Sequence, residues 1–117
     1  MGSNPQIKTQ PVIYMEEILK EWETTINHLQ IKEIEYYLLK ERLFDREQEI
    51  IDNTDFKELY GKNNNDVRKK HLKKELGLLY NELKMLELCI DNDKRRITYL
   101  KELLRTKRAI KEGLNGL

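Results

Sequence analysis

The sequence predicts an all-α protein: a long antiparallel helical hairpin, coiled-coil-like, that dimerises into a helical bundle. Three observations favour this class. Apolar residues recur at alternating steps of four and three through the C-terminal half, as a coiled-coil seam requires. Charged residues make up 37% of the 117 residues and apolar residues 38%, a composition typical of long solvent-facing helices. Opposite charges also gather at positions that an antiparallel hairpin would bring side by side.

Residues 1–11 are polar, contain both prolines and show no hydrophobic period. We therefore expect a mobile N-terminal arm, followed by a single helical-hairpin domain over residues 12–112. Pro11 suits the first turn of the helix that follows, where a missing backbone N–H costs nothing.

The first helix is predicted over residues 12–52, where apolar side chains form two stripes. The main stripe follows steps of three and four, interrupted by Glu33, Lys40 and Glu47, and comprises Met15, Leu19, Trp22, Ile26, Leu29, Tyr36, Leu43 and Ile50. The second stripe runs beside it in the C-terminal half and comprises Ile34, Tyr37 or Leu38, Phe44 and Ile51. Such a broad apolar face indicates either more than one neighbour or a bend.

Residues 53–65 interrupt the pattern with turn-forming side chains. Within this turn, Phe56, Leu59 and Tyr60 are spaced to form one helical turn that covers the end of the hairpin. Asn65 or Asp66 is the expected N-cap of the next helix.

The second helix is predicted over residues 66–111, with a flexible tail at 113–117. Its seam comprises Leu72, Leu76, Leu79, Leu83, Leu86, Ile90, Ile97, Leu100 and Leu104. Asp93 stands where the seam should continue. A buried carboxylate destabilises unless it is paired, and His28, Lys32 and Lys40 are the candidate partners. Either the seam opens at Asp93 and the carboxylate reaches water, or Asp93 specifies the register.

Charge segregation supports the antiparallel arrangement. Residues 1–52 carry 6 basic and 11 acidic groups, and residues 53–117 carry 16 basic and 10 acidic groups. A hairpin would place the basic start of the second helix beside the acidic end of the first, and its basic end beside Glu16, Glu17, Glu21 and Glu23. Exposed ion pairs contribute only about 0–1 kcal/mol each, so the pattern sets orientation more than stability.

The second helix carries more apolar surface than one neighbour covers, and the surplus is the predicted protein interface. It comprises Leu78, Met85, Leu88, Cys89, Tyr99 and Leu103. We expect this stripe to bind a second copy, giving a homodimer, or another protein. The alternative is that the first helix wraps around and covers it.

A basic cluster near the C-terminus offers a different function. It comprises Lys94, Arg95, Arg96, Lys101, Arg105, Lys107, Arg108 and Lys111, with Glu102 the one acidic residue among them. Such a cluster can contact nucleic-acid phosphates, although Tyr99 is the one aromatic residue there for base stacking. The alternative is a solvated helix end that pairs with the first helix.

Catalytic and membrane functions find no support in the sequence. Neither the two histidines nor the single cysteine, Cys89, stands at a metal-ligand spacing, and no glycine-rich phosphate loop is present. We expect no enzyme activity, cofactor or metal. Cys89 cannot form an internal disulfide, which suits a reducing cytoplasm, and no apolar run is long enough to cross a membrane.

The tract Tyr60 to Arg68 contains Gly61, Asn63, Asn64 and Arg68. It resembles the Gly-x-Asn-x-x-x-Arg junction that opens the last helix of many small phage-encoded helical proteins. The resemblance implies a phage or prophage accessory protein that works in the cytoplasm of a bacterial host and docks on a host or phage protein to modulate it. The alternatives are a non-specific nucleic-acid-binding or recombination accessory protein and a purely structural coiled-coil component.

Overall fold

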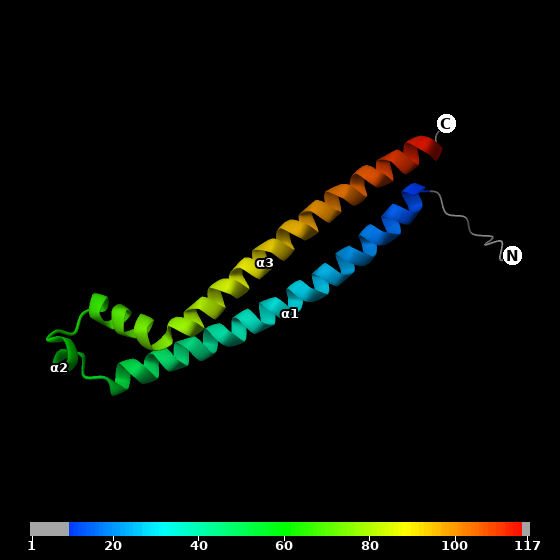
Figure 1. Ribbon diagram of the computed structural model, residues 1–117. Helices are drawn as coiled ribbons and strands as arrows, with labels where there is room; N and C mark the ends of the chain where they lie inside the picture. The colour runs from blue at the N-terminus through cyan, green and yellow to red at the C-terminus, as the bar shows by residue number, and fades with distance from the viewer. Residues whose placement is uncertain (1–9, 116–117) are drawn as a thin grey trace. The chain divides into compact units, whose positions relative to one another are not determined.

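The computed structural model describes residues 10–115, which form three helices (Figure 1). They are α1 (Gln10–Asn53), α2 (Phe56–Tyr60) and α3 (Asn65–Asn115), with no strand between residues 10 and 115. The all-α prediction is therefore confirmed. Residue contacts divide the chain into two compact units, one containing the residues up to Gln30 and those from Asp91, the other Ile31–Ile90. Both long helices take part in both units.

Helix boundaries differ slightly from the prediction. α1 begins at Gln10, so residues 10–11 of the predicted arm are helical, with Pro11 in the first turn; residues 1–9 lie outside the described chain. α3 continues to Asn115, so the helix does not stop before Gly113 as predicted. Glycine weakens a helix by about 1 kcal/mol relative to alanine without blocking it. Of the predicted tail, residues 116–117 lie outside the described chain.

In the unit Ile31–Ile90, α1 and α3 run antiparallel and bury one seam. Leu43 of α1 packs against Leu72 and Leu76 of α3, and Ile50, Ile51, Leu79, Tyr80 and Leu83 surround them. Further from the turn, the hydroxyl of Tyr36 donates to Oε1 of Glu87 over 3.0 Å. The later residue of α1 thus meets the earlier residue of α3, as the predicted hairpin requires. Within residues 31–90 no ion pair joins the two helices; the two ion pairs there lie along α1.

A bend divides α3 at Leu76, whose φ of −118° and ψ of 17° are not helical (Figure 1). The sequence predicts a continuous helix here, and this is wrong. Leu76 remains buried, so the bend keeps the seam residue in contact with α1. The apolar repeat shows only which face of a helix is buried. The same face is buried before and after the bend, so the repeat does not show that the helix bends.

The turn carries the predicted short helix, α2. The carboxylate of Asp55 accepts a hydrogen bond from the backbone N–H of Glu58 over 3.1 Å and caps its start. Gly61 ends α2 in the left-handed region with φ of 75°, which glycine adopts without steric cost. Phe56 is 2% exposed and packs edge-on against His71 of α3. α2 therefore covers the end of the hairpin, as the sequence predicts.

The cap of α3 differs from the prediction of Asn65 or Asp66. Oδ1 of Asn64 accepts the backbone N–H of Val67 over 3.0 Å, so Asn64 occupies the N-cap. All three residues can cap a helix, and the backbone path out of the turn decides which one does. Arg68 donates from Nε to Oδ1 of Asn63 over 2.7 Å, which ties it to the turn.

In the other unit, the start of α1 lies antiparallel to the end of α3. Ile18 and Leu100 are buried, and Trp22, Ile97 and Leu104 are half-buried between the helices. Leu19, predicted to lie in the main stripe, is exposed, and its neighbour Ile18 is buried instead. A repeat of three and four drifts around a helix of 3.6 residues per turn, so adjacent apolar residues can exchange roles.

Candidate protein-binding surfaces

Three large apolar side chains stand exposed on one side of α3 in the unit Ile31–Ile90. Leu78 is 84% exposed, Met85 61% and Leu88 52%. We call these three residues the α3 outer face. The first helix leaves all three exposed, so it does not cover this part of the predicted interface. Lys74, Asn81 and Lys84 are exposed around them, giving an apolar centre with a polar and basic rim.

The other predicted interface residues are placed differently. Cys89 carries a free thiol and is half-buried beside the α3 outer face. Tyr99 and Leu103 belong to the other unit. Tyr99 is exposed, with the guanidinium of Arg96 5.1 Å from the centre of its ring, whereas Leu103 is half-buried. The predicted stripe is thus divided between the two units.

A second exposed apolar surface lies on α1 in the unit Ile31–Ile90. Its five members are between 56% and 62% exposed: Ile31, Ile34, Tyr37, Leu38 and Phe44. We call them the α1 outer face. A shallow hollow of about 600 Å³ is lined by Tyr37 and Phe44 together with Tyr36, Lys40, Glu41 and Asp45. The sequence showed most of these residues as a second stripe but did not identify them as a site.

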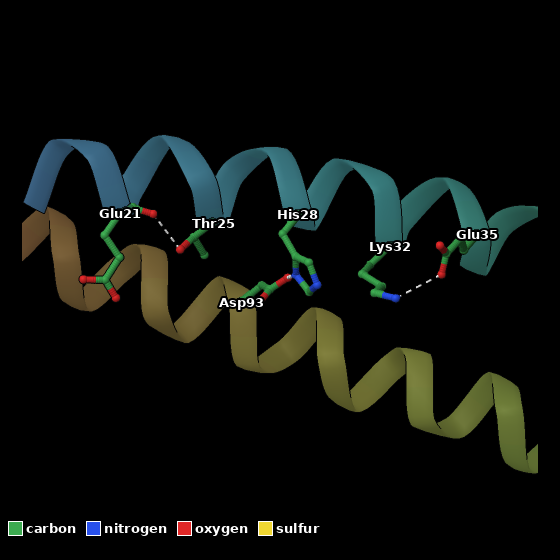
Figure 2. A network of polar contacts seen from close by, with 6 residues as sticks. All are labelled: Glu21, Thr25, His28, Lys32, Glu35 and Asp93. Atoms are coloured by element: carbon green, nitrogen blue, oxygen red, sulfur yellow. Dashed lines mark hydrogen bonds and ion pairs between the residues drawn. The ribbon is translucent and has the colours of Figure 1, made fainter.

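The polar break in the seam is filled by a specific pair. Oδ2 of Asp93 lies 2.5 Å from Nδ1 of His28, within the unit that contains both residues (Figure 2). The side chain of Asp93 is 17% exposed. Among the three predicted partners, the structure selects His28, while Lys32 pairs along its own helix with Glu35 over 3.2 Å. No group of side chains that could hold a metal ion includes this pair among the described residues.

Two tyrosines have a raised pKa because their neutral forms are favoured. The hydrogen bond to Glu87 raises the pKa of Tyr36, since only the protonated phenol can donate it. Burial raises the pKa of Tyr80 to about 12, with a further contribution from the nearby carboxylate of Glu47. Both side chains therefore stay neutral and serve as structural groups.

Part of the basic cluster contacts α1, as expected if the cluster is a solvated helix end that pairs with the first helix. The guanidinium of Arg96 donates from Nε to Oε1 of Glu21 over 2.8 Å, with Nη2 making a second contact to the same oxygen. Nζ of Lys107 lies 5.2 Å from the centre of the Tyr14 ring. Arg105 pairs with Glu102 along α3 over 3.5 Å. Arg96 and Lys107 therefore contact α1, whereas the side chain of Arg105 is 80% exposed.

Three members of the basic cluster line a groove in the same unit. Its volume is about 380 Å³, and Lys101, Glu102, Arg105 and Arg108 line it together with Leu19, Trp22 and Leu104. The indole Nε1 of Trp22 is buried without a hydrogen-bond partner in the described part of the chain. Lys94 and Arg95 are exposed on α3, and the side chain of Lys111 lies outside the described structure.

Residues 10–115 offer neither a cluster of metal ligands nor a membrane-spanning helix. No group of three or more His, Cys, Asp or Glu side chains could hold a metal ion there. No helix in that range is long and apolar enough to cross a bilayer.

No protein family, curated protein or solved structure matches this chain. The tract Tyr60 to Arg68 forms a turn and a helix cap, through the left-handed Gly61 and the Asn64 side chain.

Proposed function

We propose that the chain is a non-enzymatic protein-binding accessory factor that docks on a host or phage protein and modulates it. The observation that carries this proposal is the α3 outer face, where Leu78, Met85 and Leu88 are each more than half exposed. Contiguous exposed apolar residues with a polar rim are typical of protein interaction sites. The resemblance of the Gly61–Arg68 tract supports a phage or prophage origin and action in the bacterial cytoplasm.

The energetics favour these three residues as anchors. Burying the exposed part of each side chain contributes roughly 1–2 kcal/mol, and a few central residues commonly carry most of the free energy of binding. Leu78 and Met85 stand one heptad apart on α3, so one side of a partner helix can contact both. Lys74 and Lys84 at the rim would favour a partner with acidic residues beside its apolar contact.

Affinity capture from a bacterial lysate tests the proposal. Wild type should capture one dominant protein, and Leu78→Glu or Met85→Glu should abolish capture because each buries a carboxylate at the interface. Lys73→Glu is the matched control: it places a carboxylate at another exposed position of α3 and should retain capture. Circular dichroism should show equal helicity in all four proteins. Equal capture by wild type and both interface variants would contradict the proposal.

A second candidate function is non-specific nucleic-acid binding. The observation that favours it is the groove at which Lys101, Arg105 and Arg108 converge on one side of α3. DNA or RNA affinity should fall steeply with salt concentration, and the double variant Arg105→Glu with Arg108→Glu should remove it. Arg42→Glu, an exposed change in the other unit, is the control. Undetectable binding at about 50 mM salt would eliminate this candidate.

A further inference from the structure

The unit Ile31–Ile90 exposes apolar residues on both of its outer sides. A helix turns about 100° per residue, so Ile34 points about 180° away from Leu43, which faces the core. On α3, Leu78 and Leu88 stand five residues before and after Leu83, which packs against the core, and each points about 140° away from it. The α1 and α3 outer faces therefore lie on opposite sides of this hairpin, and a partner that covers one leaves the other uncovered.

Charge distinguishes the two faces. Glu41, Asp45, Glu49 and Asp52 are exposed on the same side of α1 as its apolar residues, with Arg42 at the edge and Lys40 lining the hollow beside Tyr37 and Phe44. Lys84 is exposed on the same side of α3 as Leu78 and Met85, with Glu82 at the edge. Lys74 lies before the bend but lines a hollow together with Leu78, and this hollow is also lined by Arg42, Arg46 and Glu75. Pairing either face with its own copy would bring like charges together. Pairing the α1 outer face with the α3 outer face brings acidic groups onto basic ones.

The two faces also match in length and shape. Residues 31–44 extend over roughly 20 Å of helix and residues 78–88 over roughly 15 Å. The hollow beside Tyr37 and Phe44 offers room for a long, adaptable side chain such as that of Met85. The α1 outer face thus offers aromatic and acidic groups that the α3 outer face lacks, and the α3 outer face offers basic groups at its rim.

We infer that a second copy of this chain binds head to tail, with its α3 outer face on the α1 outer face of the first. Such a contact is heterologous, since each copy uses two different surfaces. It produces rings or open chains of subunits rather than a closed dimer. The inference goes beyond the proposed function: it uses the same α3 outer face, so a second copy and a foreign partner would compete for it.

Charge reversal tests the pairing directly. One variant carries Glu41→Lys with Asp45→Lys, which makes both outer faces basic; the other carries Lys74→Glu with Lys84→Glu, which makes both acidic. Sedimentation velocity over about 1–200 μM protein should show wild-type species larger than a dimer. Each variant alone should associate at least tenfold more weakly, and an equimolar mixture should recover wild-type assembly, because every contact then joins opposite charges.

The control variant carries Glu23→Lys, an exposed reversal in the other unit, with Lys69→Glu, an exposed reversal outside the α3 outer face, and should assemble like wild type. Three results would overturn the inference: wild type that stays monomeric at the highest concentration, a mixture that does not recover assembly, or a closed dimer unaffected by either reversal. Affinity capture separates this inference from the proposed function. A foreign partner that depends on Met85, captured by a chain that does not self-associate, would support the function and reject the head-to-tail contact.

Discussion

The same substitution, glycine to alanine, should have opposite effects at Gly77 and Gly61. Gly77 lies in α3 just after the bend, and a Cβ added there would meet nothing within 4 Å. Alanine is more favourable than glycine in a helix by about 0.8–1.0 kcal/mol, so Gly77→Ala should stabilise the protein by about that amount. Gly61 has a φ of 75°, where a side chain costs about 1–2 kcal/mol. Alanine also makes the unfolded chain less flexible, which offsets roughly 0.4–1 kcal/mol of this cost. Gly61→Ala should therefore destabilise the protein by about 1 kcal/mol.

Urea unfolding followed by far-ultraviolet circular dichroism measures both effects, with linear extrapolation giving the free energy of unfolding. Protein concentration should be low and equal in every sample, because self-association would add to stability. The two variants should differ by about 2 kcal/mol. A loss of stability in Gly77→Ala would show that the bend at Leu76 requires glycine beside it and would refute this reasoning. A neutral Gly61→Ala would refute the left-handed cap of α2.

The remaining predictions concern the core, the seam and one tyrosine. Leu100 is 1% exposed, so Leu100→Ala should lower the free energy of unfolding by about 2–5 kcal/mol, whereas Leu78→Ala, at an exposed position, should change it by less than about 0.5 kcal/mol. Asp93→Leu should stabilise by roughly 1–2 kcal/mol, because leucine completes the seam and leaves His28, whose side chain is 51% exposed, to water; a destabilised variant would show that the pair is needed. Tyr80 has a pKa of about 12 in the folded chain and about 10 when unfolded. The folded state therefore holds this proton more tightly, and stability should fall between pH 10 and 12. Urea unfolding across that range should show a smaller fall in Tyr80→Phe.

Much of the fold could be predicted because coiled-coil spacing reports directly which side of a helix is buried. Every apolar seam residue from Leu72 to Leu104 is buried or half-buried, and the short helix at Phe56 was visible from its spacing. The bend at Leu76 could not be predicted, since the same residues face the core on both sides of it. Ile18 replaces Leu19 for a related reason: both are apolar neighbours, and only packing against α3 selects one.

The candidate surfaces were predictable in part. The exposed positions of Leu78, Met85 and Leu88 follow from the seam, because residues on the far side of a helix cannot reach the same partner. The second stripe of α1 was also visible, but its exposure was not, since a third helix or a wider turn could have covered it. The inward contacts of Arg96 and Lys107 depend on which carboxylate and which ring the opposite helix presents.

The sequence by itself determined two long helices, an antiparallel seam and a capped turn, because periodicity, glycine conformation and capping side chains act over a few neighbouring residues. The tertiary structure decided which apolar stripe is covered, which partner Asp93 takes and where α3 bends. These depend on the surface of the opposite helix, and one helix can cover only one side of another. The apolar residues left outside on α1 and α3 are therefore where binding is to be sought.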